Sequence, residues 1–284
     1  MADLEVGAAP PATGEPPGPP PRVSVLIGAY DNAATLAAAI HAVLGQTVSD
    51  LELIVIDDGS TDSSASIARA AAAADPRVRV LSMGRNVGIS RSLNEGLHAA
   101  RAPVVAVQDA DDTSEPRRLE RQLAVLDGAP DVAVVGCRMR EVDELGAELT
   151  PRTAFAAGDV RAALLRFNPI PNSSAAFRRD VAIELGGYDP RYRYAMEYDL
   201  WLRIAERHRV VALDELLATR RMSRTNVAAR KERAQIAESI AMRLRALRRR
   251  RSLRGAAWLA VPALSYVTPL PLKRALRRRL GMAP

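Results

Sequence analysis

The chain has 284 residues, of which 48% are hydrophobic, 26% charged and 4% aromatic, a composition typical of a globular protein with a sizeable core. The single cysteine, Cys137, excludes internal disulfides and cysteine-based zinc clusters and fits a reducing compartment. From Arg230 onwards there are 15 Lys and Arg against two Glu, or +13, so the net charge of +7 leaves about −6 for the rest. This basic segment lacks the interleaved aromatics or zinc-finger spacing of a nucleic-acid binder, and we expect no nucleic-acid partner.

Short apolar strands alternate with helices through the first part of the chain. Residues 1–21 are rich in proline and have no apolar run, so we expect a disordered tail without a secretory signal. The pattern then predicts strands at 22–30, 51–56, 78–81 and 104–107, and helices at 33–44, 63–74 and 90–100. This alternation predicts an α/β fold with a mostly parallel central sheet flanked by helices.

An acidic turn follows the strand at 104–107, with Asp109, Asp111 and Asp112 within four positions. Alternate side chains of extended backbone lie on the same side, so Asp109 and Asp111 can converge on one point. A divalent cation makes such a point favourable, because carboxylates suit Mg²⁺ and Mn²⁺, and Mg²⁺ usually completes its shell with water and phosphate oxygens. The turn therefore predicts a metal site whose partner is a diphosphate.

The turn on its own has a second interpretation, in which a residue of 112–114 caps a helix that begins near Pro116. Two other predicted strands also end in polar residues, at Tyr30 and at Asp58. In parallel sheets, ligands bind beyond the carboxyl ends of the strands, where the strand order switches. Three strands that deliver polar groups to one rim favour a binding site over an isolated acidic turn.

Four segments in order resemble the family-2 glycosyltransferases of GT-A fold: Ser24-Val-Leu-Ile-Gly-Ala-Tyr-Asp-Asn, Leu53-Ile-Val-Ile-Asp-Asp-Gly-Ser-Thr-Asp, Asn86-Val-Gly-Ile-Ser and Asp109-Ala-Asp-Asp. The resemblance covers about residues 22–220. It implies a Rossmann-like nucleotide-binding half plus an acceptor half. It also implies a nucleotide-diphospho-sugar donor, an Mg²⁺ or Mn²⁺ ion bridging the diphosphate, and transfer with inversion at the anomeric carbon.

The resemblance also implies roles for individual residues. Tyr30 matches the aromatic that lies against the nucleobase, although it could instead pack at the end of its strand. Asp58 matches the carboxylate that accepts a hydrogen bond from the base, although it could instead form an Asx turn. Asp111 is the first choice as metal ligand, and Asp109 is the second, binding the metal or the donor's sugar or ribose. We expect Asp112 to cap the next helix.

Glu197 is the expected general base, which takes the proton of the acceptor hydroxyl. The family usually has Asp two residues before the run Asp199-Leu-Trp-Leu-Arg203, and this chain has Glu197 there. A glutamate keeps the chemistry but moves the oxygen by about one C–C bond. In a helix, Glu197 shares one face with apolar residues three, four and seven positions on. Asp199 lies off that face, with Arg203 placed to pair with it.

Two departures from the family pattern bear on function. Many relatives have a histidine near the end of the catalytic domain, where this chain has Met222; we expect Arg220 or Arg221 to neutralise the diphosphate instead. The Gln-x-x-Arg-Trp motif of processive synthases is absent, which favours transfer of a single sugar. A catalytically inactive nucleotide-sugar-binding scaffold or regulator is the alternative. A nucleotidyltransferase would require a glycine- and arginine-rich phosphate loop, which the N-terminal part lacks.

The C-terminal part predicts a basic helix at 228–254, followed by residues 255–272 with no charged residue and a second basic cluster. The uncharged stretch is short for a membrane span and contains prolines. We expect this segment to associate with an anionic membrane surface. The alternatives are packing on the catalytic domain or on a second subunit, and a true membrane span. The expected domains are 1–21, 22–222 and 223–284. The protein is expected in the cytoplasm or on the inner face of the cell membrane, acting on a glycan or lipid-linked acceptor in cell-envelope or polysaccharide biosynthesis.

Overall fold

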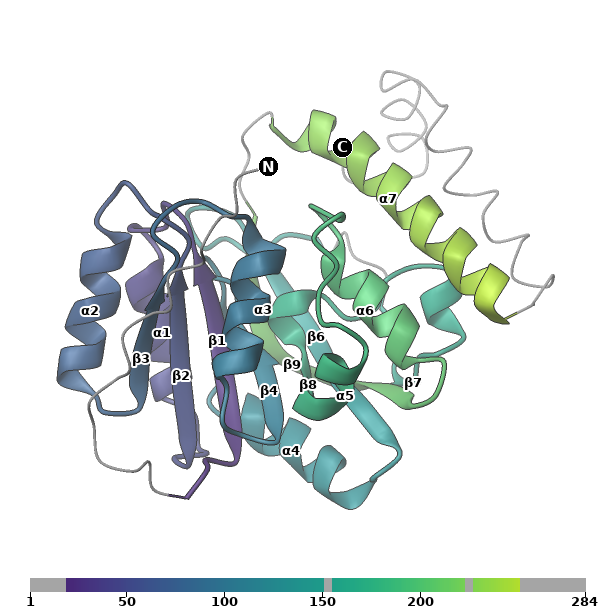
Figure 1. Ribbon diagram of the computed structural model, residues 1–284, viewed down its shortest axis with the longest axis horizontal. Coiled ribbons are helices and arrows are strands. Elements are labelled where there is room, and N and C mark those ends of the chain that lie inside the picture. Colours follow the sequence, from purple (N-terminus) through teal and green to yellow (C-terminus); the bar gives the residue numbers. More distant parts are fainter. Residues whose placement is uncertain (1–18, 151–154, 223–226, 251–284) are drawn as a thin grey trace, which may run out of the picture.

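The computed structural model describes residues 19–150, 155–222 and 227–250. Within these residues the strands form one nine-stranded sheet in the order β3-β2-β1-β4-β8-β6-β9-β5, with β7 beside β9 (Figure 1). The strands are β1 Val23–Ala29, β2 Leu51–Asp57, β3 Val78–Ser82, β4 Val104–Val107, β5 Thr113–Ser114, β6 Val132–Val142, β7 Gly158–Asp159, β8 Ala176–Arg178 and β9 Arg209–Arg221. The helices are α1 Leu36–Leu44, α2 Ser64–Ala74, α3 Ile89–Ala99, α4 Arg118–Gly128, α5 Arg179–Glu184, α6 Met196–Ile204 and α7 Val227–Arg250, with short 3₁₀ turns η1 Ala163–Leu165 and η2 Asn172–Ser174.

Residues 22–112, here called the parallel half, follow the predicted alternation of strands and helices and end in the acidic turn after β4. β1 pairs in parallel with β2 on one side and β4 on the other, and β3 pairs in parallel with β2. Every residue of β2 and β4 is buried, which is why these strands are mostly apolar rather than alternating. Glu52 is a buried charged residue inside β2, and it pairs with Arg79 and Arg101. Helix α1 begins at Leu36, three residues later than predicted, because the carbonyl of Asn32 closes a turn by accepting from the amides of Thr35 and Leu36.

Residues 113–250, here called the mixed half, complete the sheet with both strand directions. β8 is antiparallel to β4 and to β6, whereas β6 runs parallel to β9 with irregular register near Cys137. β5 pairs antiparallel with the last part of β9. A mixed α/β sheet with flanking helices is therefore present, and the predicted fold class is confirmed.

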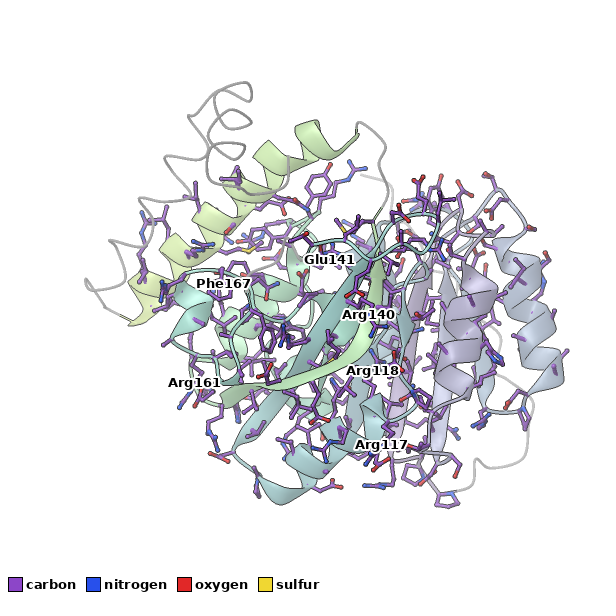
Figure 2. All side chains as sticks on the ribbon, turned by 180° about the vertical axis from the view of Figure 1, so that it is seen from behind. Arg117, Arg118, Arg140, Glu141, Arg161 and Phe167 are labelled. Atoms are coloured by element: carbon purple, nitrogen blue, oxygen red, sulfur yellow. The ribbon has the colours of Figure 1, made fainter. Side chains whose placement is uncertain are left out.

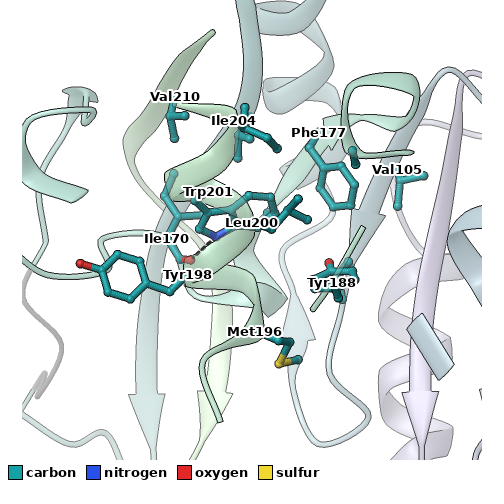
Figure 3. Close-up of a cluster of buried hydrophobic side chains, with 14 of the residues drawn as sticks. Val105, Ile170, Phe177, Tyr188, Met196, Tyr198, Leu200, Trp201, Ile204 and Val210 are labelled. Atoms are coloured by element: carbon teal, nitrogen blue, oxygen red, sulfur yellow. Dashed lines mark hydrogen bonds between the residues drawn. The ribbon is translucent and has the colours of Figure 1, made fainter. Parts of the chain in front are cut away.

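Helix α6 lies in an apolar cluster shared by both halves, which also contains Leu26, Ile54 and Val105 (Figure 3). Trp201 is fully buried, stacks obliquely on Phe177 and donates from Nε1 to the carbonyl of Ile170 at 2.9 Å. The predicted pair of Asp199 and Arg203 exists, at 2.7 Å, but it is buried rather than on an outer face. The reason is that Arg203 also donates to two carbonyls of the turn between α5 and α6, which covers that side of the helix.

Helix α7 packs along α6 (Figure 1), and it confirms a helix over the described part of the predicted range 228–254. The rest of the predicted C-terminal segment, including residues 255–272, lies outside the described residues, as does nearly all of the tail at 1–21. Among the helices that the structure describes, none has both the length and the apolar character needed to cross a membrane.

Candidate active site

Three adjacent parallel strands bring Tyr30, Asp58 and Asp109 to one edge of the sheet. Tyr30 follows the end of β1, Asp58 follows β2 and Asp109 lies two residues past β4. In space the order of these strands is β2-β1-β4, and the chain order reverses between β1 and β4. This is the place where doubly wound sheets form a crevice for ligands. The shared rim expected from the sequence is thus present.

Tyr30 has an exposed ring, with 44% of the residue accessible. Packing at the end of the strand therefore does not explain it. Its backbone is set by a local turn, in which the Tyr30 amide donates to Asn32 Oδ1 at 3.0 Å. The next residue, Asp31, has φ of +52° and accepts from the amide of Thr61 at 2.8 Å. The ring is available on the rim as a flat surface for a ligand.

Asp58 is buried and both of its carboxylate oxygens are engaged. They accept from the amides of Val87 and Gly88, at 2.8 and 3.0 Å, and so hold the loop between β3 and α3 against the rim. The Asx-turn role belongs instead to the preceding residue, since Asp57 Oδ1 accepts from the Ser60 amide at 3.1 Å. Contact of Asp58 with a nucleobase stays a prediction.

Asp109 lies close to a second carboxylate, that of Asp111. Burial, together with the nearby Asp111 carboxylate, raises its pKa to about 6, while Arg220 opposes the rise. Its amide donates to Ser173 Oγ at 3.0 Å, and its Oδ1 accepts from Asn172 Nδ2 at 3.4 Å. Asp111 is exposed. A half-buried and an exposed carboxylate that repel one another would both be stabilised by a shared cation.

Asp112 does not cap α4, and that expectation is wrong. Its Oδ1 accepts from the amide of Arg221 at 3.0 Å, and α4 begins at Arg118 with no side-chain cap. The reason is that the chain after the acidic turn forms β5, which pairs with β9 and draws Asp112 toward that strand. Burial first, then Asp109 and Asp111, raise the pKa of Asp112 well above its usual range. Asp112 thus ties the acidic turn to the end of β9.

Arg220 is the arginine that faces the carboxylates. The ladder between β5 and β9 places Thr219 opposite Thr113, so the end of β9 lies beside the acidic turn. The charge of Arg220 lowers the pKa of Asp109 and of Glu197. The neighbouring Arg221 instead donates from Nη1 to the carbonyl of Glu144 at 2.8 Å. Of the two arginines weighed in the sequence, Arg220 is therefore the one whose charge acts on Asp109 and Glu197, and its contact with a diphosphate stays a prediction.

Arg118 is a site residue that sequence reasoning missed. It is fully buried and donates from Nη1 to the carbonyls of Val107 and Ser173, joining the end of β4 to the loop that contacts Asp109. Its Nε and Nη2 have no hydrogen-bond partner, and burial lowers its pKa while Asp112 and Asp109 oppose that shift. Figure 2 labels Arg118 and the neighbouring Arg117. Arg117 is exposed and pairs with Glu120. No sequence signal separates the two arginines.

Glu197 lies in the first turn of α6 and meets a partner that the sequence did not predict. Asn168 Nδ2 donates to Glu197 Oε1 at 2.9 Å. Burial raises the pKa of Glu197 to about 7, with the charge of Asp109 adding to the rise and Arg220 opposing it. A carboxylate with a pKa near neutrality suits a general base. The charges of Asp109 and Arg220 both act on Glu197, which indicates that Glu197 lies near the acidic turn.

The loop at 168–174 contacts both carboxylates. Asn168 binds Glu197, whereas Asn172 binds Asp109 and also accepts from the buried Tyr188 hydroxyl at 3.1 Å. This loop is polar and contains Pro169 and Pro171, but no spacing in the sequence indicates which asparagine meets which carboxylate. The loop therefore couples the rim of the sheet to α6.

The carboxylates alone do not form a closed metal site. Within the residues that the structure describes, no group of three or more His, Cys, Asp or Glu is arranged to hold an ion. Two carboxylates of the acidic turn fit a hard cation that takes its remaining ligands from phosphate and water. This donor set suits Mg²⁺ or Mn²⁺ in the presence of a diphosphate and does not suit a structural zinc ion.

Comparison with known proteins settles the family. The family model described as "Glycosyl transferase family 2" matches residues 24–186, which is more than half of the chain. The chain belongs to glycosyl transferase family 2. A relative, EpsE of Bacillus subtilis, is 35% identical over 192 residues, covering 66% of this chain and 67% of EpsE. The amylovoran biosynthesis glycosyltransferase AmsE of Erwinia amylovora is 31% identical over 198 residues, covering 68% and 74%.

Solved structures of other glycosyltransferases have the same fold at low sequence identity. The mannosyltransferase PcManGT of Pyrobaculum calidifontis, in complex with GDP-Man and Mn²⁺, has a TM-score of 0.64 and 20% identity, covering 96% of this chain and 83% of that one. TarS of S. aureus, residues 1–349, has a TM-score of 0.64 and 16% identity, covering 80% and 65%. These neighbours are GT-A glycosyltransferases, so the GT-A architecture of this family-2 chain is confirmed.

Proposed function

We propose that this family-2 glycosyltransferase is inverting and metal-dependent, and that it moves one sugar from a nucleotide-diphospho-sugar to a hydroxyl group. The observation that carries the proposal is the arrangement around the rim: Asp109 and Asp111 follow β4, Arg220 lies beside them, and Glu197 shares their electrostatic environment. Donor groups and a base are thus collected at one place. A solved neighbour of the same fold holds GDP-Man and Mn²⁺.

The donor end of the reaction uses the rim. The exposed ring of Tyr30 offers a surface for the nucleobase. Asp109 and Asp111 would hold Mg²⁺ or Mn²⁺, which supplies positive charge to the diphosphate as it leaves. Arg220 adds a fixed positive charge on the same side, so the developing negative charge of the leaving group is stabilised by groups already in place.

The acceptor end uses Glu197. Asn168 binds Glu197 Oε1, which leaves Oε2 to accept the proton of an acceptor hydroxyl as its oxygen attacks the anomeric carbon. The bond to the diphosphate oxygen breaks on the opposite face of the sugar, so a single displacement inverts the centre. No covalent enzyme intermediate is required, and no serine or cysteine nucleophile is needed.

The biological setting follows from the relatives. AmsE is named for amylovoran biosynthesis and ExoO of Rhizobium meliloti for succinoglycan biosynthesis. These names support a role in polysaccharide or cell-envelope biosynthesis, with a glycan or lipid-linked acceptor. Exposed arginines on the described part of α7, among them Arg248 and Arg249, are compatible with attachment to an anionic membrane surface from the cytoplasmic side.

A donor panel tests the proposal. Purified protein with Mn²⁺ or Mg²⁺ is titrated with UDP-, GDP- and dTDP-sugars, and release of the nucleoside diphosphate is followed with and without membrane lipid extract as acceptor. We expect metal-dependent binding of one donor class, and turnover that Asp111→Asn removes. Asp127→Asn is the matched control, because Asp127 is exposed and paired with Arg22. Donor binding without turnover under any condition would indicate a sugar-nucleotide-binding scaffold, and no metal-dependent binding would refute the proposal.

A further inference from the structure

The segment before α6 leads directly into Glu197, which lies in the first turn of that helix, and it is held from two directions. On one side α3 contributes Asn94, which pairs with the backbone of Tyr188 through two hydrogen bonds of 2.8 Å. Ser90 Oγ, also from α3, donates to the carbonyl of Tyr192 at 3.1 Å. These contacts fix the start of the segment but leave the three residues before Met196 to be held by something else.

Helix α7 supplies that second set of contacts. Glu238 accepts from two successive backbone amides, with Oε1 bound to Arg193 N at 2.9 Å and Oε2 to Tyr194 N at 3.0 Å. Hydrogen bonds in which the acceptor is ionised are shorter and stronger than neutral ones. Both bonds end on the backbone, three and four residues before Glu197, so they act on the path of the chain rather than on a side chain.

Two further contacts of α7 flank the same segment. Arg245 Nη1 donates to the Tyr192 hydroxyl at 2.7 Å, and Arg243 Nε donates to the Tyr198 hydroxyl at 2.9 Å. Tyr198 is the residue directly after Glu197. Arg243 is buried, and its Nη1 has no hydrogen-bond partner, which costs free energy of desolvation. Helix α7 thus contacts the chain on both sides of Glu197.

We propose that Glu238 is a positioning residue for Glu197, and that α7 is a working part of the active site rather than an appendage. The proposal rests on the proposed function, in which Glu197 is the base. Glu238 touches no reacting group; it fixes the backbone from which Glu197 reaches the acceptor. Because the donor rim is built from β1, β2 and β4, loss of Glu238 should slow transfer while leaving donor binding intact.

The test compares Glu238→Ala and Glu238→Gln in the full chain with the control Gln235→Ala, which alters an exposed position of the same helix. Three quantities are measured: the donor Kd with Mn²⁺, the kcat of transfer, and hydrogen exchange of the peptide that contains Arg193 and Tyr194. We expect Glu238→Ala to speed exchange at these amides and to lower kcat about tenfold, with the donor Kd within twofold. Glu238→Gln should fall between, because its amide offers only one accepting oxygen, and Gln235→Ala should match the wild type.

The outcomes separate the two proposals. Faster exchange at the two amides with unchanged kcat would overturn the positioning role while leaving the proposed function in place. Unchanged exchange would overturn it as well, since the two hydrogen bonds would not be holding the segment. A donor Kd that rises together with the fall in kcat would point to general damage to the fold and would also count against it. If the wild-type chain transfers no sugar from any donor, the proposed function fails first, and the positioning role falls with it.

Discussion

The parallel half and the mixed half place their polar groups by different means. In the parallel half, adjacent strands end at one edge, and the backbone itself delivers Tyr30, Asp58 and Asp109 to the rim. In the mixed half, side chains distant in the sequence hold the site together, as Asn168 holds Glu197 and Glu238 holds the segment before it. We therefore expect changes in the first region to remove donor binding and changes in the second to slow transfer while donor binding survives.

The largest effect is expected from Asp109→Asn, which removes a carboxylate from the region expected to bind the donor. Changing a partner of a metal ligand already costs 10- to 100-fold in metal affinity, so loss of a direct carboxylate should weaken metal-dependent binding of a nucleoside diphosphate by about 100-fold. Calorimetric titration of UDP and GDP, with and without Mn²⁺, measures this. Binding within threefold of the wild type would show that Asp109 does not hold the metal.

A smaller effect is expected from Arg220→Met. Arg220 lies at the end of β9, where the mixed half meets the acidic turn. Removing a fixed positive charge that faces the leaving group should lower kcat by about 30-fold. Arg221→Met is the matched control, since the Arg221 side chain points to the carbonyl of Glu144 and its backbone amide still binds Asp112. Steady-state rates of both variants measure the difference, and equal losses in the two would contradict the assignment of Arg220.

The pH dependence of transfer tests whether Glu197, in the mixed half, is the base. The pKa of Glu197 is raised to about 7, and the base accepts a proton only when it is ionised. The rate should therefore fall on the acid side of about pH 7, approaching a tenfold loss for each further unit. Asp109 and Glu238 raise this pKa and Arg220 lowers it. A rate that stays flat from pH 5 to 8 would count against Glu197 as the base.

The smallest expected effect is a change in the free energy of unfolding of the variant Glu197→Gln. The folded-state pKa of about 7 lies above the ordinary value of 4.5, so the ionised carboxylate is disfavoured in the folded state. This penalty is absent below pH 4.5, grows up to pH 7 and is constant above it. The variant should therefore gain about 1–2 kcal/mol in free energy of unfolding at pH 8, and none at pH 4. Urea denaturation at both pH values checks this, and an equal change at the two would contradict it.

The same contrast explains what the sequence could predict. Strand ends are readable, because buried runs such as 51–56 and 104–107 stop abruptly at polar residues, and all seven predicted elements of the parallel half are present. The role expected of Asp112 failed because the two-residue strand β5 is too short to show in a pattern, and it pairs with a strand about 100 residues away.

The partners within the mixed half could not be predicted for a related physical reason. Asn168 acts through one hydrogen bond to another segment, and Arg118 and Glu238 each act through two. Neither periodicity nor spacing in the sequence indicates such contacts. Arg117 and Arg118 illustrate the limit, because one is exposed and the other is fully buried beneath the acidic turn. The side of the helix on which Glu197 lies could be predicted only because apolar residues of α6 follow on the same face.

The most direct test of the account is to measure donor affinity and sugar transfer together in Glu197→Gln. The variant keeps the size of the side chain and an oxygen for Asn168, but it cannot take a proton. The account predicts that the donor Kd in the presence of Mn²⁺ stays within threefold of the wild type, while kcat falls by about 1,000-fold. Transfer within tenfold of the wild-type rate would contradict the role of Glu197, and loss of donor binding would contradict the division of labour between the two halves.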